Sequence, residues 1–280
     1  MRPVLLSILL LLLAVSPASA SADSGYVALG DSYASGPGIP AHTGEPAGCG
    51  RSDQNYPAVL AGWLRVQPFT DVSCGGATTE HMSGAQPVSG GTNPPQLDAL
   101  RPDTALVTLT IGGNDIGFGE ILATCGRLGA GDPTGDPCRR HYTASGRDVL
   151  AGRIQTTAGR IATVLTEIKK RSPRAKLVVV GYLRILPDAP GCWPRVPFAA
   201  KDTAYFDATE RLLNRSTAEV ARAAGARFVN PYLFSAHRDA CQIPERRWVE
   251  PLRPASPAAS MHPNAAGMKV VAGLTWLVAR

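Results

Sequence analysis

The chain alternates short apolar runs with longer amphipathic ones. The clearest short run is 104–111, which reads Thr-Ala-Leu-Val-Thr-Leu-Thr-Ile and is apolar or β-branched at nearly every position. Such a run is typical of a strand that is covered on both faces. The clearest long run is 145–171, where Ile154, Ile161 and Ile168 recur on one side of a helix. Pro173 follows it and marks the end of that helix.

The same two patterns recur along the rest of the chain. We expect further strands at 26–29, 69–73, 176–181 and 227–230, and further helices at 55–66, 202–224 and 264–278. Apolar strands that alternate with helices predict an α/β fold, with a parallel sheet of about five strands and helices on both faces. The Gly-, Pro- and Cys-rich stretches are expected to be loops within one domain, at 34–52, 84–96, 125–138 and 186–199.

The first 20 residues have the pattern of a secretory signal peptide. Arg2 precedes the apolar run Val4–Val15, and Ala18-Ser19-Ala20 offers a small-residue cleavage site, with a second register ending at Ala22. A run of 12 residues spans about 18 Å as a helix, against about 30 Å for a bilayer core. We therefore expect a secreted protein, released or associated with the cell wall, with its single domain at 23–280.

Composition narrows the class of protein further. The chain has 280 residues, of which 44% are hydrophobic and 18% charged, and a net charge of +6. The hydrophobic fraction excludes wholesale disorder, and the 29 Gly and 24 Pro residues show no collagen period. The basic residues are scattered rather than gathered on one stripe, so we expect no nucleic-acid partner.

Six cysteines follow the signal peptide: Cys49, Cys74, Cys125, Cys138, Cys192 and Cys241. In an exported chain an even number of cysteines predicts disulfides, here three. A zinc site is disfavoured, because the chain has no Cys-x-x-Cys pair and no Cys/His cluster. The sequence alone leaves many pairings open. Pairing between sequence neighbours is the simplest, since each bond would close one loop between successive elements.

Four short blocks of polar and glycine residues lie in the loops of the expected sheet. They are Gly30-Asp31-Ser32, Cys74-Gly75-Gly76-Ala77-Thr78-Thr79, Gly112-Gly113-Asn114-Asp115 and Met261-His262-Pro263-Asn264. Each block alone is compatible with an ordinary turn or helix cap. Together they supply a hydroxyl nucleophile (Ser32), a base (His262) and hydrogen-bond donors for a developing oxyanion, from the Gly76 backbone and the Asn114 side chain.

Other common sites of α/β proteins are missing from the sequence. No Gly-x-Ser-x-Gly motif is present, which excludes the α/β-hydrolase nucleophile elbow. No Gly-x-Gly-x-x-Gly or P-loop motif follows a strand, which disfavours a nucleotide or redox role.

At the four blocks the chain resembles the SGNH (GDSL) hydrolase family, in particular its secreted actinobacterial esterase and lipase branch. The match is carried by Gly30-Asp31-Ser32-Tyr33, by Gly76, by Gly112-Gly113-Asn114-Asp115 and by His262-Pro263. These blocks occur in order between residues 26 and 270, which is nearly the whole chain after the signal peptide.

The resemblance implies a flavodoxin-like three-layer α/β/α sandwich and a set of roles for the motif residues. Ser32 would be the nucleophile and His262 the base, while Gly76 and Asn114 would bind the oxyanion together with the Ser32 N–H. No metal or organic cofactor is implied. The same branch implies three disulfides between neighbours, Cys49–Cys74, Cys125–Cys138 and Cys192–Cys241.

One departure concerns the group that orients the histidine. The family usually has Asp three residues before the His, and this chain has Ala259 there. We therefore expect a Ser–His dyad in which the main-chain carbonyl of Ser260 accepts the Nδ1 proton of His262, as some relatives in this branch are understood to do. The alternative is a carboxylate from elsewhere in the chain, such as Asp239 or Glu250. In the second block, Gly75 stands where many relatives have Ser, which matters little for a backbone donor.

The implied reaction is hydrolysis of a carboxylic ester through an acyl-enzyme. Fatty-acyl esters are favoured over acetylated sugars, because the loops at 34–52, 84–96 and 186–199, which we expect to shape the acyl pocket, carry apolar residues. We expect a monomer that binds a small-molecule or lipid ester and makes transient contact with lipid surfaces. The rival functions are a phospholipase or acyltransferase on the same site, and a non-catalytic surface binding protein that kept the fold.

Overall fold

The computed structural model describes residues 25–280 of the chain, so the expected signal peptide lies outside the described residues. The main sheet has five parallel strands in the order β2-β1-β5-β6-β7. These strands are β1 (Tyr26–Gly30), β2 (Phe69–Asp71), β5 (Leu106–Thr110), β6 (Lys176–Val180) and β7 (Arg227–Val229). The α/β fold with a parallel sheet of about five strands is confirmed.

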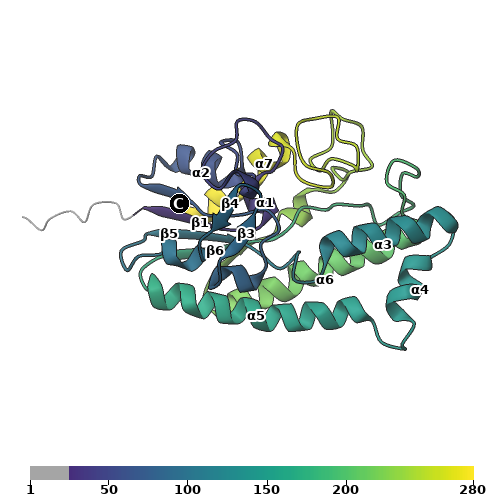
Figure 1. Cartoon of the computed structure of the whole chain (residues 1–280), viewed down its shortest axis with the longest axis horizontal. Helices are drawn as coiled ribbons and strands as arrows, with labels where there is room; N and C mark the ends of the chain where they lie inside the picture. The colour runs from purple at the N-terminus through teal and green to yellow at the C-terminus, as the bar shows by residue number, and fades with distance from the viewer. Residues whose placement is uncertain (1–24) are drawn as a thin grey trace, which may run out of the picture.

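Helices cover both faces of the sheet (Figure 1), with α2 and α7 on one face and α5 and α6 toward the other. The helices are α1 (Ser32–Ser35), α2 (Tyr56–Leu64), α3 (Phe118–Gly131), α4 (Pro137–Thr143), α5 (Val149–Arg171), α6 (Asp202–Ala223) and α7 (Ala265–Ala279). The three-layer α/β/α sandwich implied by the resemblance is therefore present.

The two faces of the sheet follow from the alternation of side chains along its strands. Val178 and Val180 of β6 belong to the core that contains residues of α2 and α7. Leu177 and Val179, which alternate with them, belong to the core that contains Ile161 and other residues of α5. Both sets are buried, which explains why β6 reads as a continuous apolar run.

The expectation of a loop at 125–138 is wrong, because this stretch contains the end of α3 and the start of α4. Its helical glycines, Gly126, Gly129 and Gly131, each cost roughly 1 kcal/mol relative to alanine, so the stretch does not look like a helix in the sequence. One of them is required by packing: a Cβ at Gly129 would lie 2.3 Å from the Pro197 carbonyl oxygen. The expected loop at 84–96 also contains a short antiparallel hairpin, β3 (Gln86–Val88) and β4 (Gly91–Asn93).

The six cysteines form three disulfides, Cys49–Cys74, Cys125–Cys138 and Cys192–Cys241. These are the three neighbour pairs. The first joins the loop after α1 to the loop after β2, and the second joins α3 to α4. Within residues 25–280, no helix combines the length and the apolar character needed to cross a bilayer.

Candidate active site

Ser32 stands at the carboxyl end of β1, as the first residue of α1. The Asp31 carboxylate caps this short helix by accepting the Tyr33 N–H at 2.9 Å. Gly30 closes the strand with φ +149°, and a Cβ there would lie 2.5 Å from the Thr110 carbonyl oxygen. The chain therefore leaves β1 against β5 through a turn that only glycine fits, and this turn presents Ser32 at the rim of the sheet.

The position of Ser32 agrees with the topology of the sheet. The strand order places β1 between β2 and β5, where connections leave toward opposite sides. In open parallel sheets, ligands bind outside the carboxyl ends of the strands at such a switch point. Ser32 follows β1 and residues 112–115 follow β5, so two of the four blocks meet there.

His262 reaches the same rim from the loop that precedes α7. Its Nε2 lies 2.7 Å from the Ser32 Oγ, and its Nδ1 lies 2.7 Å from the Ser260 carbonyl oxygen. A carbonyl oxygen only accepts hydrogen bonds, so Nδ1 carries the ring proton and Nε2 has its lone pair toward Ser32. The tautomer needed for a general base is thus set by the main chain.

The aromatic ring of Tyr33 supports the histidine. It lies 5.1 Å from the His262 ring, and its hydroxyl donates to the Met261 carbonyl at 2.7 Å. Met261 has φ +60°, a conformation that is uncommon for a residue with a side chain. The residue that follows Ser32 therefore holds the loop that carries His262.

Neither candidate carboxylate reaches the imidazole. The Glu250 carboxylate accepts hydrogen bonds from Asn264 and from the Ala255 and Ser256 amides, and it pairs with Arg247 at 2.7 Å. Asp239 binds the Cys241 amide and the Gln242 side chain. Glu250 supports the histidine loop through its carboxylate, which binds Asn264, and through its backbone N–H, which donates to the His262 carbonyl at 2.9 Å.

The expected oxyanion donors lie beside Ser32. Ser32, Gly76, Asn114 and His262 all line one open hollow at the surface, together with Phe118 and Leu122 of α3. The N–H groups of Ser32 and Gly76 have no acceptor within residues 25–280. The Asn114 amide uses one N–H for the Ala77 carbonyl at 2.9 Å, which leaves its second N–H for a ligand.

A buried hydrogen-bond chain links the first and third blocks. The Tyr182 hydroxyl donates to Asp31 at 2.6 Å and accepts the Gly113 N–H at 2.8 Å. Burial raises the pKa of Asp31 to about 7, and its bonds to Tyr182 and the Tyr33 amide limit the rise. Asp115 likewise holds the second block, because it accepts the Thr79 N–H. Both aspartates therefore support loops rather than face the hollow.

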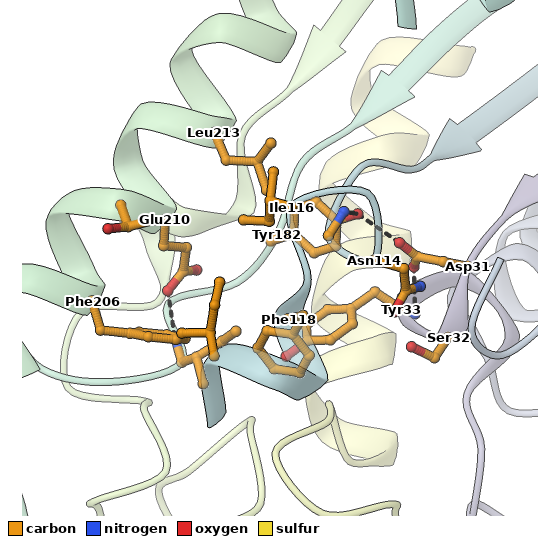
Figure 2. Close-up of a pocket in the computed structure, with 14 residues that line it drawn as sticks. Asp31, Ser32, Tyr33, Asn114, Ile116, Phe118, Tyr182, Phe206, Glu210 and Leu213 are labelled. Atoms are coloured by element: carbon orange, nitrogen blue, oxygen red, sulfur yellow. Dashed lines mark hydrogen bonds between the residues drawn. The ribbon is translucent and has the colours of Figure 1, made fainter. Parts of the chain in front are cut away.

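A second, inner pocket begins at Ser32 and runs under Phe118 toward α6 (Figure 2). Its walls are mostly apolar: Ile116, Phe118, Ile121, Ile185, Phe206 and Leu213. None of the residues that line this cavity comes from the loops at 34–52, 84–96 and 186–199, which we expected to shape the acyl pocket. Helices α3 and α6 and the residues after β5 and β6 form it instead.

The sequence analysis missed several residues of this site. Tyr182 had an available signal, since it follows a clear strand just as Ser32 and Asn114 do. Glu210 also had one: it lies four residues after Phe206 on the buried face of α6, where a charged residue is unusual. Phe118 had none, because α3 was not recognised. No group of three or more His, Cys, Asp or Glu side chains in the described part of the chain is placed to bind a metal.

Comparison with known proteins gives concordant similarities. The model of the GDSL-like Lipase/Acylhydrolase family matches residues 28–270. Lipase 2 of Streptomyces coelicolor is 38% identical over 265 residues, which cover 92% of this chain and 86% of that protein. The solved extracellular lipase of Streptomyces rimosus is 28% identical with a TM-score of 0.73, and phospholipase A1 of Streptomyces albidoflavus is 26% identical with a TM-score of 0.71. Both alignments cover 91% of this chain and 98% of the other.

Proposed function

Because the chain belongs to the GDSL-like lipase/acylhydrolase family, we propose that it hydrolyses fatty-acyl esters through an acyl-enzyme formed on Ser32. Its class, a lipase or esterase acting on carboxylic esters, follows from family membership. The observation that carries the mechanism is the pair of contacts that the His262 ring makes, 2.7 Å from Nε2 to Ser32 Oγ and 2.7 Å from Nδ1 to the Ser260 carbonyl oxygen.

The reaction proceeds in two steps on a Ser–His dyad. As Ser32 Oγ attacks the ester carbonyl carbon, its proton passes to His262 Nε2, and the imidazolium keeps its Nδ1–H on the Ser260 carbonyl. The proton then goes to the departing alkoxide, which leaves as the alcohol. A water molecule attacks the acyl-enzyme by the reverse proton route and releases the acid, which regenerates Ser32.

The negative charge of each tetrahedral intermediate falls on the former carbonyl oxygen. The Ser32 N–H, the Gly76 N–H and the free N–H of Asn114 are its proposed donors. They are fixed before the substrate arrives: Gly76 by its turn at φ +76°, and Asn114 by its bond to Ala77. Donors that need no rearrangement are the effective ones, and each contributes roughly 10²–10³ in rate. The mechanism requires no cofactor.

We propose that the enzyme acts outside the cell as a single domain spanning 23–280. The three disulfides fit an oxidising compartment, and the similar lipase of Streptomyces rimosus is described as extracellular. Its partner is an ester substrate, met in solution or at a lipid surface. Phospholipids are the second candidate substrate, because one similar structure is a phospholipase A1.

The proposal is tested by substrate range and by trapping of the nucleophile. We expect the protein to hydrolyse p-nitrophenyl butanoate and octanoate, and to be inactivated by a p-nitrophenyl alkylphosphonate that adds one phosphonyl group to Ser32 in peptide mass spectra. Phosphatidylcholine and an added alcohol acceptor identify phospholipase or acyltransferase activity in the same assay. A protein that hydrolyses none of these esters, or that is labelled elsewhere, contradicts the proposal.

The pH dependence of turnover is expected to report the His262 base. Burial lowers the pKa of His262 from its usual 6.5, and the Ser260 carbonyl raises it in part. The neutral ring is the active form, so kcat/KM rises as pH increases through this pKa and reaches half of its plateau below pH 6.5. The pH profile of a soluble ester measures the midpoint. Asp31→Asn is the control, since a midpoint that moves in this variant belongs to Asp31 instead.

Substitution of the two carboxylates that do not contact the imidazole distinguishes a Ser–His dyad from a catalytic triad. Asp239→Asn and Glu250→Gln are each expected to keep kcat/KM within about tenfold, whereas loss of a carboxylate that orients a catalytic histidine costs about 10⁴. Glu250→Gln should still lower thermal stability, because it leaves the buried Arg247 without its charge partner. Steady-state kinetics at a temperature where both variants are folded gives the answer; a 10⁴-fold loss in either would restore the triad.

A further inference from the structure

Glu210 is a buried carboxyl group that the proposed mechanism does not use. It lies on α6, is 5% exposed, and one of its oxygens, Oε2, accepts the Ile185 N–H at 3.0 Å. The other oxygen, Oε1, is buried and has no hydrogen-bond partner within residues 25–280. A buried polar atom without a hydrogen-bond partner costs folding free energy. A bound molecule that forms a hydrogen bond with this oxygen would remove that cost.

The side chain lines the inner pocket, on the far side from Ser32 (Figure 2). Ser32, Asn114 and Phe118 line both this pocket and the open hollow, so the two spaces meet at the nucleophile. Among the described residues that line the inner pocket, Glu210 alone has a buried side-chain oxygen or nitrogen without a partner. The cavity volume is about 30 Å³, room for about two water molecules.

The position of the base decides which half of an ester enters the inner pocket. His262 lines the hollow but not the inner pocket. The leaving alcohol must receive its proton from His262, so it lies in the hollow. The acyl group, bound to Ser32 Oγ on the other side of the carbonyl carbon, is then directed toward Phe118, Phe206 and Glu210.

The hydrogen-bonding character of Glu210 follows from its surroundings. Burial raises its pKa well above the usual value, the nearby Asp207 adds to the rise, and the Ile185 amide and Arg184 oppose it. Burial therefore favours the protonated form of this carboxyl group. Since Oε2 accepts the Ile185 N–H and Oε1 has no partner within residues 25–280, the proton of that form is placed on Oε1, which makes this oxygen a hydrogen-bond donor at the wall of an apolar pocket.

We propose that the inner pocket is the acyl subsite and that Glu210 selects a short acyl chain carrying an acceptor oxygen, such as an ether or keto group. The inference rests on the proposed function and refines its acyl group. An all-carbon chain fills the apolar walls but leaves Oε1 unpaired, whereas an oxygen at the matching position accepts its hydrogen. Phe118, at the junction of the two spaces, is the side chain past which the acyl group enters.

The test compares p-nitrophenyl pentanoate and hexanoate with their isosteres in which one CH₂ is replaced by an ether oxygen at successive positions. The measured quantity is the kcat/KM ratio of ether to parent, divided by the same ratio for Glu210→Met. This division cancels the intrinsic reactivity of each ester. At the matching position we expect about a 3- to 10-fold advantage in the wild type, as for one hydrogen bond. Glu210→Gln is the matched control, because its amide can accept from Ile185 and donate into the pocket, so it should keep the advantage.

Three outcomes bear on the inference. Equal ratios in the wild type and Glu210→Met at every position overturn it and leave Glu210 a support for Ile185. If Glu210→Met does not fold, Leu213→Phe, which narrows the pocket, should reduce kcat/KM for pentanoate at least fivefold more than for acetate; equal losses overturn the acyl assignment. If the wild type cleaves none of the unsubstituted esters, the proposed function itself fails, which the first two outcomes leave intact.

Discussion

Ser32→Ala is expected to reduce kcat/KM for p-nitrophenyl butanoate by at least about 10⁴-fold, the loss typical of a serine nucleophile. The change removes one oxygen whose hydrogen-bond partner is His262 Nε2 at 2.7 Å. What remains is the hollow with its N–H donors, which gives only the slow reaction of bound ester with water. Initial rates with a titrated protein concentration measure the loss.

The folded structure should tolerate this variant. Ser32 is 9% exposed at the start of α1, and Asp31 caps that helix through the Tyr33 amide rather than through Ser32. We expect the melting temperature to stay within about 2 °C of the wild type, since the change removes one hydrogen bond at the wall of the open hollow and leaves the helix cap in place. An active Ser32→Ala protein with an intact fold would show that the ester is attacked by another group.

His262→Ala is expected to cause a loss of the same order, about 10⁴-fold or more. Without the imidazole, the Ser32 hydroxyl has no base and the leaving alcohol has no acid. The double variant Ser32→Ala, His262→Ala should be no slower than either single variant, because the two residues act as one unit. Kinetics of the three variants on one soluble ester tests this non-additivity.

Added imidazole provides a sharper control for His262→Ala. The substitution opens space between Ser32 Oγ and the Ser260 carbonyl, each 2.7 Å from a ring nitrogen in the wild type. Imidazole in millimolar concentration should therefore restore part of the activity of His262→Ala and none of that of Ser32→Ala. Rescue of both variants, or multiplicative losses in the double variant, would contradict the dyad.

The sheet could be predicted from the sequence because its strands are buried on both faces. β5 and β6 are apolar or β-branched almost throughout, and α5 carries an apolar stripe that Pro173 ends. α3 escaped prediction because its glycines lower helix propensity, while the close approach of Gly129 to Pro197 is a tertiary contact with no local signature. The ends of helices also differ from those expected: α5 begins at Val149, with Asp148 as its N-cap, whereas the sequence suggested a start at residue 145.

The candidate site, like the fold, has residues that the sequence predicts and residues that it does not. Ser32, Gly76, Asn114 and His262 could be proposed from short motifs, because their chemistry demands particular residue types in loops at the rim of the sheet. The choice between the Ser260 carbonyl and a distant carboxylate needed the fold, since it depends on where Glu250 points. Tyr182 and Glu210 each carried a local signal in the sequence, but their place in this site depends on the pairing of β6 with β5 and on the packing of α6 against β6.

The contact between Ser32 and His262 joins residues 230 positions apart, and Tyr33 connects the same two segments again through Met261. A chain still emerging from the ribosome therefore holds Ser32 long before it holds His262. The proposed dyad forms only when the segment that carries Met261 and His262 docks against Ser32 and Tyr33. We expect a copy that is cut short before residue 262 to keep the hydroxyl group and the N–H donors but to lack the base.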